Sequence, residues 1–245
     1  MTTIGAATDE FDDHEVASTL ASSLESLDGA VNYRNWIFDL ARGHLAPEIL
    51  EVGAGHGTFT EVLIDLGPVT AVEPDPRGSK VLHDRFGADP AVSIVGGTLD
   101  DVPASGYGSA VMINVLEHIE DDEGALTSLR DLVDPGGHLV IWVPAFSQLY
   151  SPFDRKLGHF RRYRRADLQA VVRRAGLDVV DQRYVNLPGW FSWLLLVKLL
   201  RREPTSPRLV GIFDRVVVPV TRWFESRVRV PFGQSILLVA RVPLR

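Results

Sequence analysis

The sequence contains no cysteine, which excludes disulfide bonds and catalysis by a thiol. It also lacks an excess of positive charge. The 245 residues carry a net charge of −7, so the molecule as a whole does not have the electrostatic character of a nucleic-acid-binding protein. The N-terminal stretch MTTIGAATDEFDDHE is acidic and polar and lacks the basic start and apolar stretch of a signal peptide, so we expect a cytoplasmic protein.

A repeating order of strand, glycine turn and helix begins after Pro47. Apolar runs predict strands and helical patterns predict helices: strands at 48–54, 69–75, 91–97, 109–116 and 138–144, and helices at 58–67, 76–87 and 123–133. The strands are almost continuous Val, Ile and Leu, which is typical of strands buried on both faces. The alternation predicts an α/β fold built on a doubly wound, mostly parallel sheet.

Both ends of the chain depart from this pattern. Two helical segments precede the sheet, and after Pro144 the rhythm stops and further elements follow: helices at 14–27, 32–45 and 166–176, strands at 177–185 and 234–242, an apolar stretch at 187–202, and a helical region at 208–228 interrupted at Pro219. The two added strands bring the sheet to seven. No internal repeat is present, so we expect a single domain over residues 1–245 with an insertion between the sixth and seventh strands.

Three glycines, Gly53, Gly55 and Gly57, follow the first strand and open a helix. Glycine lets a ligand approach the backbone closely, and open α/β sheets bind ligands at this edge. The dinucleotide fingerprint needs a further glycine where Thr58 stands, so this pattern is excluded. Glu73 ends the second strand, at the position where a carboxylate binds ribose hydroxyls. A purely structural tight turn is the alternative for the glycines alone.

Five stretches occur in an order and spacing that mark a known family: LEVGAGHG, AVEPD, GGTLDDVP, INVLEHIEDD and LVDPGGHLVIWVP. Over these stretches and the last strand, the sequence resembles the class I S-adenosylmethionine-dependent methyltransferases. The resemblance implies a Rossmann-like seven-stranded sheet with helical additions that form a lid. It also implies S-adenosylmethionine as cofactor and a small-molecule acceptor. It divides the chain into N-terminal helices (1–45), a cofactor-binding core (46–146), acceptor-site additions with the insertion (147–234) and the last strand (235–243).

The resemblance also assigns residues to the cofactor: Tyr33, Glu51, Gly53, Gly55, Glu73, Pro74, Thr98, Leu99 and Asn114. Glu51 and the two glycines would hold the methionine end, and Glu73 with the backbone beside Pro74 would bind the ribose. Thr98 and Leu99 would lie beside the adenine, although many relatives have an aspartate where Thr98 stands.

Two further assignments concern the sulfonium and the lid. Asn114 would lie at the end of the fourth strand, near the sulfonium of the cofactor. Tyr33 and Trp36 lie on the helix that often closes over the cofactor in this family. Packing in the core is the alternative for both, and it is favoured for Trp36.

Two histidines are candidate catalytic residues. His118 follows the fourth strand, on the side where the methyl group is expected, and can act as a base toward a hydroxyl or amine acceptor. The alternative is a structural role in capping the next helix. His159 is placed to face the acceptor. The acidic run at 120–123 is interpreted as a helix start, because carboxylates there complement the helix dipole, and no spacing in the sequence indicates a metal site.

Two segments bear on the acceptor. Arg161, Arg162, Arg164 and Arg165 surround Tyr163, and such a cluster either binds an anion or forms a solvated basic surface. The apolar stretch 190–200 is too short to span a bilayer; it forms a buried helix, the wall of an apolar pocket, or a contact with a membrane surface.

Together these segments suggest O-methylation of a hydrophobic acid, such as a fatty acid or lipid-like acceptor. Two alternatives remain open. One is a different small-molecule hydroxyl or amine acceptor. The other is a non-catalytic module that binds the cofactor or a lipid on the same fold.

Overall fold

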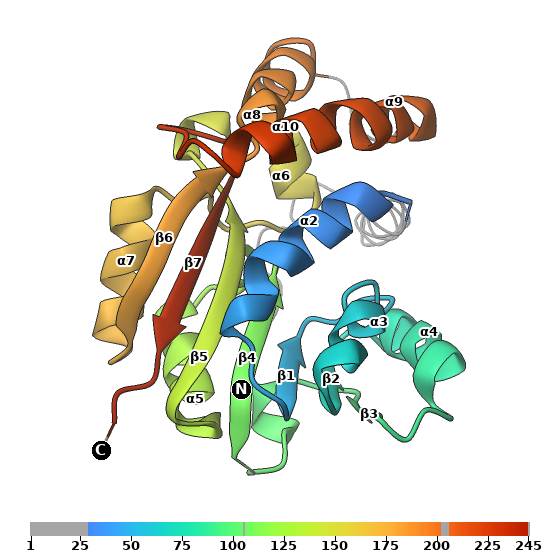
Figure 1. The fold of residues 1–245 in the computed structure, drawn as a ribbon, viewed down its shortest axis with the longest axis vertical. Coiled ribbons are helices and arrows are strands. Elements are labelled where there is room, and N and C mark those ends of the chain that lie inside the picture. The colour runs from blue at the N-terminus through green and yellow to red at the C-terminus, as the bar shows by residue number, and fades with distance from the viewer. Residues whose placement is uncertain (1–28, 105, 202–205, 245) are drawn as a thin grey trace.

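The computed structural model describes residues 29–104, 106–201 and 206–244. The predicted helix at 14–27 lies outside them. The sheet has seven strands in the order β3-β2-β1-β4-β5-β7-β6 (Figure 1). In chain order they are β1 Ile49–Val52, β2 Val69–Val72, β3 Val92–Val95, β4 Tyr107–Ile113, β5 Val133–Pro144, β6 Asp178–Val185 and β7 Ser235–Arg241.

The sheet confirms the predicted doubly wound, mostly parallel fold. Strands β1 to β5 pair in parallel, whereas β7 is antiparallel to both β5 and β6. The strand order reverses at β1, because β2 and β3 lie on one side of it and all later strands lie on the other. Open α/β sheets bind ligands at the carboxyl ends of the strands beside such a reversal.

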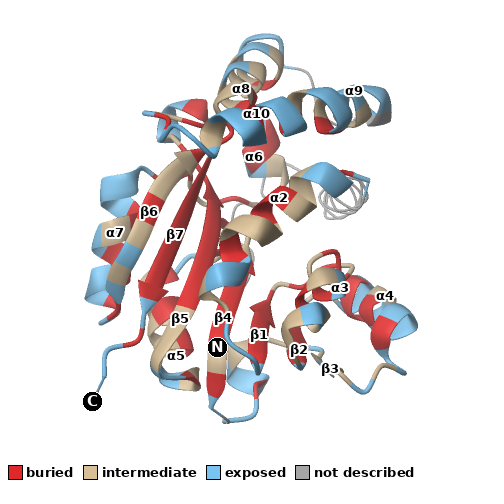
Figure 2. Ribbon diagram, in the orientation of Figure 1, coloured by how far each residue is buried: buried red, intermediate tan, exposed pale blue. Residues whose placement is uncertain are grey.

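Helices cover both faces of the sheet, and each face has its own apolar core. One core is covered by α5 Asp122–Leu132 and α7 Arg165–Arg174, and the other by α2 Val31–Ala41, α3 Thr60–Leu63 and α4 Pro76–Phe86. Side chains alternate between faces along a strand, so Leu50 and Val52 enter the first core and Ile49 enters the second. Figure 2 shows the central strands as almost entirely buried.

The insertion, residues 186–234, forms helices beyond the carboxyl ends of the parallel strands (Figure 1). Its first helix consists of α8 Leu187–Ser192 and the π segment η6 Trp193–Leu199. Its second consists of α9 Pro207–Ile212, the π segment η7 Phe213–Val217 and α10 Val218–Glu225. Among the described residues, no helix combines the length and the apolar character needed to cross a bilayer.

The predicted interruption at Pro219 was wrong. Helical backbone continues from Pro207 to Glu225, and Pro219 is the second residue of α10, directly after η7. Proline disrupts an α-helix because it cannot donate the regular backbone hydrogen bond. A π turn just before it shifts that hydrogen-bond ladder, so the missing N–H costs less here than inside a regular helix.

A buried carboxylate joins the insertion to α2. Asp214 of η7 accepts backbone hydrogen bonds from Tyr33 N–H at 2.8 Å and from Asn32 N–H at 3.2 Å. The residue before α2, Ala30, has no side chain that can cap the helix. Asp214 therefore caps α2 from a distant part of the chain and fixes this helix against the insertion.

Candidate active site

The glycine loop leaves the carboxyl end of β1 with positive φ at Gly53, Gly55 and Gly57, of 70°, 56° and 81°. A side chain at Gly53 would collide with Val115, and one at Gly57 would collide with Phe86. The N–H groups of Gly53 and Ala54 both donate to Val72 O, at 2.8 and 3.0 Å. The loop is therefore held against β2, with glycine required by both conformation and space.

Glu73 lies directly beside this loop. Its Oε2 accepts from the Gly55 N–H at 2.7 Å and its Oε1 accepts from the Asp75 N–H at 2.8 Å. Burial raises the pKa of Glu73, and these two backbone hydrogen bonds act against that shift. Each carboxylate oxygen can accept more than one hydrogen bond, so capacity remains for two ligand hydroxyls. Pro74, the next residue, is exposed.

Glu51 lies at the same end of the sheet and is buried. Its Oε2 accepts a hydrogen bond from the Thr60 hydroxyl at 2.5 Å. Burial raises the pKa of Glu51 to about 8, against the effect of Thr60, and the nearby Glu73 adds to the rise. The structure thus brings together Glu51, the glycine loop and Glu73.

Thr98 and Leu99 lie after β3, where Thr98 begins the short helix η3 Leu99–Asp101. The Thr98 N–H donates to Asp101 Oδ2 at 2.9 Å, and the Thr98 hydroxyl accepts from the Asp100 N–H at 3.4 Å. The hydroxyl that was expected near the adenine is thus part of a capping box, which competes with a ligand contact.

Asn114 follows β4 with a φ of 53°, which is unusual for a residue other than glycine. Its N–H donates to Trp142 O at 2.8 Å, and the next residue, Val115, contacts the glycine loop at Gly53. Such backbone strain is often found at functional sites. Asn114 therefore belongs to the same group of residues as Gly53 and Glu51.

Tyr33 lies on α2 and packs against Trp142, whose carbonyl accepts the Asn114 N–H. Its ring packs edge to face with those of Trp36 and Trp142, with centroids 6.2 and 6.1 Å away. Burial raises the pKa of Tyr33, and polar groups of Ser235, Trp142 and Asn186 oppose that rise. Tyr33 is thus directed toward the start of β7 and the insertion. Trp36 is buried in the core, as the favoured alternative predicted.

The two candidate histidines are brought together by the fold. His118 ends η4 Leu116–His118, just after β4, and His159 follows α6 Pro152–Lys156, yet their ring centroids are 4.5 Å apart. Burial lowers the pKa of His118 to about 3, and His159 contributes to this shift. Burial also lowers the pKa of His159, against the effect of Asp154. Both rings are therefore neutral near pH 7.

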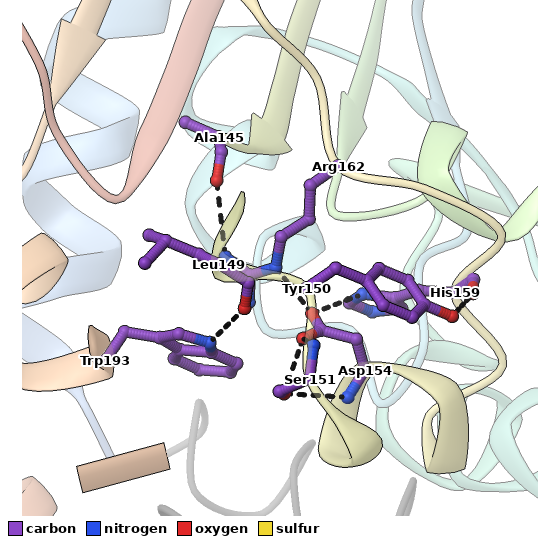
Figure 3. A network of polar contacts seen from close by, with 8 residues as sticks. All are labelled: Ala145, Leu149, Tyr150, Ser151, Asp154, His159, Arg162 and Trp193. Carbon is purple, nitrogen blue, oxygen red and sulfur yellow. Dashed lines mark hydrogen bonds and ion pairs between the residues drawn. The ribbon is translucent and has the colours of Figure 1, made fainter. Parts of the chain in front are cut away.

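Asp154 is the centre of a buried polar network around His159 (Figure 3). Its Oδ1 lies 3.2 Å from His159 Nδ1 and accepts from Arg162 Nε at 2.7 Å, and its Oδ2 accepts from the Ser151 hydroxyl at 2.7 Å. Burial opposes ionisation of Asp154, but His159, Arg162 and Ser151 lower its pKa overall. An ionised Asp154 only accepts, so neutral His159 carries its proton on Nδ1. Its Nε2 is left with a free lone pair.

Glu117 is a residue that the sequence analysis missed. It precedes His118, is completely buried, and neither of its carboxylate oxygens has a hydrogen-bond partner among the described residues. Burial raises its pKa to about 8. Ligating atoms of Glu117, His118 and His159 all lie within 4.8 Å of one another. Sequence spacing could not reveal this group, because His159 comes from a distant segment.

Two of the four clustered arginines are paired with acids of the protein. Arg161 Nη1 lies 2.7 Å from Asp122 Oδ2, and Arg162 is buried against Asp154. These pairs match the structural alternative for the two residues. Arg165 is exposed and lies over the Tyr184 ring, 5.6 Å from its centroid.

An aromatic cluster begins where β5 ends. Phe146 stacks on Tyr184 with centroids 4.8 Å apart and meets Trp190 edge to face at 6.4 Å. Trp190 in turn packs against Phe191 and Phe232, each at 5.1 Å. The indole N–H of Trp190 is buried without a hydrogen-bond partner among the described residues. The cluster joins β5, β6 and the insertion into one apolar wall, named here the aromatic wall.

Comparison with known proteins agrees with this geometry. A family model described as a methyltransferase domain matches residues 20–182, which is more than half of the chain. The ubiquinone biosynthesis O-methyltransferase of Cereibacter sphaeroides is 28% identical over 176 residues, which cover 60% of this chain and 67% of that protein.

Two solved structures share the fold. The N-methyltransferase NodS of Bradyrhizobium japonicum, in complex with S-adenosylhomocysteine, aligns with a TM-score of 0.55 at 16% identity over 85% of each chain. Phosphoethanolamine N-methyltransferase 2 of Haemonchus contortus, in complex with S-adenosylmethionine, aligns with a TM-score of 0.55 at 14% identity over 81% of this chain and 49% of that one.

The seven-stranded sheet and the family match define the class of protein: an enzyme with the Rossmann-like methyltransferase fold. The chain belongs to the class I S-adenosylmethionine-dependent methyltransferase family. The recognition made from the sequence motifs, and the cofactor that it implied, are confirmed.

Proposed function

We propose that this enzyme methylates an oxygen of a hydrophobic acid, such as a fatty acid or a lipid-like acceptor. The observation that carries the proposal is the aromatic wall. It starts at Phe146, directly after β5, and β5 is the parallel neighbour of β4, whose end holds Asn114. An apolar acceptor lying along this wall would have its reacting oxygen next to the site assigned to the cofactor's methyl group.

In this proposal the glycine loop and its neighbours hold S-adenosylmethionine. The three glycines of the loop have positive φ and leave its backbone without side chains, and Glu73 has unused acceptor capacity at its edge. Glu51 and Asn114 lie at the methionine end, and Thr98 and Leu99 lie beside the adenine. The cofactor supplies an electrophilic methyl group when bound. The chain's own residues orient the acceptor and exclude water.

The additions at 147–234 supply the acceptor side of what we regard as one domain. Tyr33 belongs to this side by its position between Trp142 and Ser235. With Arg161 and Arg162 paired to acids, Arg164 and Arg165 are the exposed arginines of the cluster, and we assign Arg165, which lies over Tyr184, the role of attracting a carboxylate at the edge of the wall. A carboxylate acceptor needs positioning and no base.

A series of saturated fatty acids tests the proposal. Formation of S-adenosylhomocysteine is measured for each acid, with acetate as the small polar control. Each buried methylene stabilises by at most ~0.8 kcal/mol, so kcat/KM should rise by up to about fourfold per methylene and then level off. A flat series, or activity on acetate alone, would reject the hydrophobic acceptor.

A phenolic or other hydroxyl acceptor with an apolar tail is the second candidate. It is favoured by the neutral rings of His118 and His159, since a hydroxyl must lose a proton, and by the similarity to the ubiquinone biosynthesis O-methyltransferase of Cereibacter sphaeroides. Alkylphenols and fatty acids of matched length, assayed side by side, separate the two candidates.

We further propose that the insertion contacts an anionic membrane surface. On its second helix, five apolar residues spaced three or four apart form one stripe and are each 57–65% exposed: Leu209, Ile212, Val216, Val220 and Trp223. The opposite side of this helix is the buried one, with Asp214, Val218 and Thr221. A helix that buries one side and exposes an apolar stripe on the other has a second surface to bury. Figure 2 shows this exposed side over α9 and α10.

The charge of the insertion specifies the surface that it contacts. Residues 186–234 hold eight of the 25 Lys and Arg but three of the 32 Asp and Glu of an acidic chain. Basic side chains beside an exposed apolar stripe suit anionic lipid headgroups. Such contact would bring the enzyme to the source of a lipid-like acceptor.

Co-sedimentation with phosphatidylcholine vesicles, with and without phosphatidylglycerol, tests membrane contact. We expect binding that needs phosphatidylglycerol and is weakened by Val220→Ser with Trp223→Ser. Val180→Ser, which alters an exposed apolar residue on β6, is the matched control. Equal sedimentation of all variants, or a loss of self-association as the sole effect of the double change, would overturn the proposal.

A further inference from the structure

The buried carboxyl group of Glu117 lies close to two histidine rings, and its burial is costly unless something else binds there. Both oxygens of Glu117 are buried and unpaired within the described part of the chain. An unpaired buried polar group costs the full desolvation penalty of that group. The mechanism proposed above gives Glu117 no task.

The three side chains form a ligand set of two imidazoles and one carboxylate. Their ligating atoms all lie within 4.8 Å of one another. Atoms bound at about 2.0–2.2 Å to a single ion lie within ~4.4 Å of each other, so side-chain movements of under about 1 Å bring them into coordination. Imidazole and carboxylate together suit Zn²⁺ and similar first-row ions, whereas Mg²⁺ and Ca²⁺ prefer oxygen ligands alone.

The surroundings of His159 are those of a metal ligand. Asp154 receives the Nδ1–H and therefore fixes the ring orientation and leaves Nε2 free for an ion. Asp154 is itself fixed by Arg162 and by Ser151. The Tyr150 hydroxyl also donates to the backbone carbonyl of His159, at 2.6 Å. A carboxylate–histidine pair of this kind raises the basicity of the free nitrogen.

The local charge also favours a dication. The positive charge of Arg162 is paired with Asp154 at 2.7 Å, so an ion that displaces the proton of Glu117 meets a carboxylate whose charge is not already paired with Arg162. His118 adds a second imidazole from the same segment as Glu117. The backbone joins the two ligand segments directly, because the Phe160 N–H donates to Glu117 O at 2.8 Å.

We propose that Glu117, His118 and His159 form a binding site for a divalent transition-metal ion such as Zn²⁺. The site follows β4, so the ion would lie on the acceptor side of the cofactor loop. Resting on the proposed function, we assign the ion the task of binding the acceptor oxygen. Its binding to the protein is independent of that task and is measured without an acceptor.

The experiment uses the full chain after treatment with a chelator. Isothermal titration with Zn²⁺ should give one ion per chain, and Co²⁺ should give a visible absorption band that Zn²⁺ then removes. Glu117→Gln and His159→Gln should each weaken binding by at least about 100-fold, which exceeds the 10- to 100-fold effect of residues behind the ligands. Gln has the same shape as Glu, so the Glu117→Gln variant should retain the fold of the original chain, which circular dichroism checks.

A second histidine pair provides the matched control. His44 and His138 also pack edge to face, with centroids 6.1 Å apart, at the other end of the sheet. His44→Gln with His138→Gln should leave Zn²⁺ binding unchanged. Absence of binding, binding equal in Glu117→Gln and the original chain, or loss of binding in this control would overturn the proposed site. Zn²⁺ binding without methyl transfer to any acceptor would refute the proposed function and leave the metal site standing.

Discussion

Replacing Glu51 by Gln should remove a large pH dependence from the stability of this enzyme. In the structure without ligand, burial raises the pKa of Glu51 from 4.5 to about 8. The folded state therefore favours the protonated form. The stability associated with that form is complete below the unfolded pKa and is lost as the pH rises from there through the folded pKa.

The size of the effect follows from the shift. One pKa unit corresponds to about 1.36 kcal/mol, so ionisation of Glu51 should destabilise the folded chain by about 4 kcal/mol at pH 8 and by less than about 1 kcal/mol at pH 5. Gln does not ionise, and its amide oxygen can still accept from the Thr60 hydroxyl. The variant should thus match the original chain near pH 5 and exceed it in stability at pH 8.

Urea unfolding of both proteins at several pH values between 5 and 8, without cofactor, measures this difference. Other buried carboxyl groups with raised pKa values, Glu73 and Glu225 among them, titrate in both proteins, so the difference isolates Glu51. A difference in free energy of unfolding that stays constant across this range would refute the reasoning. It would mean that Glu51 is solvated or paired in the folded chain.

Three further predictions concern the glycine loop and the capping of α2 by the insertion. Glu73→Gln should weaken S-adenosylmethionine binding by roughly 1.5–3 kcal/mol, measured by isothermal titration against the exposed Glu61→Gln control; unchanged affinity would remove Glu73 from the cofactor site. Gly53→Ala should lower the free energy of unfolding through both φ strain and collision with Val115. Adding Val115→Ala should recover the part of this loss that is due to the collision, whereas additive losses in the double variant would argue against the contact. Asp214→Ala should cost about 1–2 kcal/mol of stability through loss of the α2 cap, and Asn there should retain part of it; equal losses would argue against capping.

The sheet was predictable because each of its elements is encoded locally. Runs such as 139–143 and 236–240 are apolar at every position, and glycines or prolines lie close to their ends. Such signals need no knowledge of distant residues. The cofactor edge was predictable for the same reason, since Gly53, Glu73 and Asn114 each follow a strand that the sequence reveals.

What the sequence did not reveal depends on contacts between distant segments. Glu117 becomes a candidate ligand because the fold places His159 close to it. Asp214 caps α2 from a segment far along the chain. The pairing of Arg162 could not be predicted because its partner, Asp154, lies on a short helix without an apolar pattern. Pro219 was misinterpreted because the rule for proline assumes regular α-helical hydrogen bonding, and η7 is not regular.

The insertion and the segment that carries His159 are parts of one packed unit, and Trp193 is a residue that joins them. Its indole N–H donates to Leu149 O at 3.2 Å, and its ring lies 4.3 Å from the Arg162 guanidinium carbon (Figure 3). Arg162 in turn holds Asp154, which orients His159. The same side chains therefore set the position of the first helix of the insertion and the direction of His159 Nε2. An acceptor that displaced this helix would therefore also alter the proposed metal site.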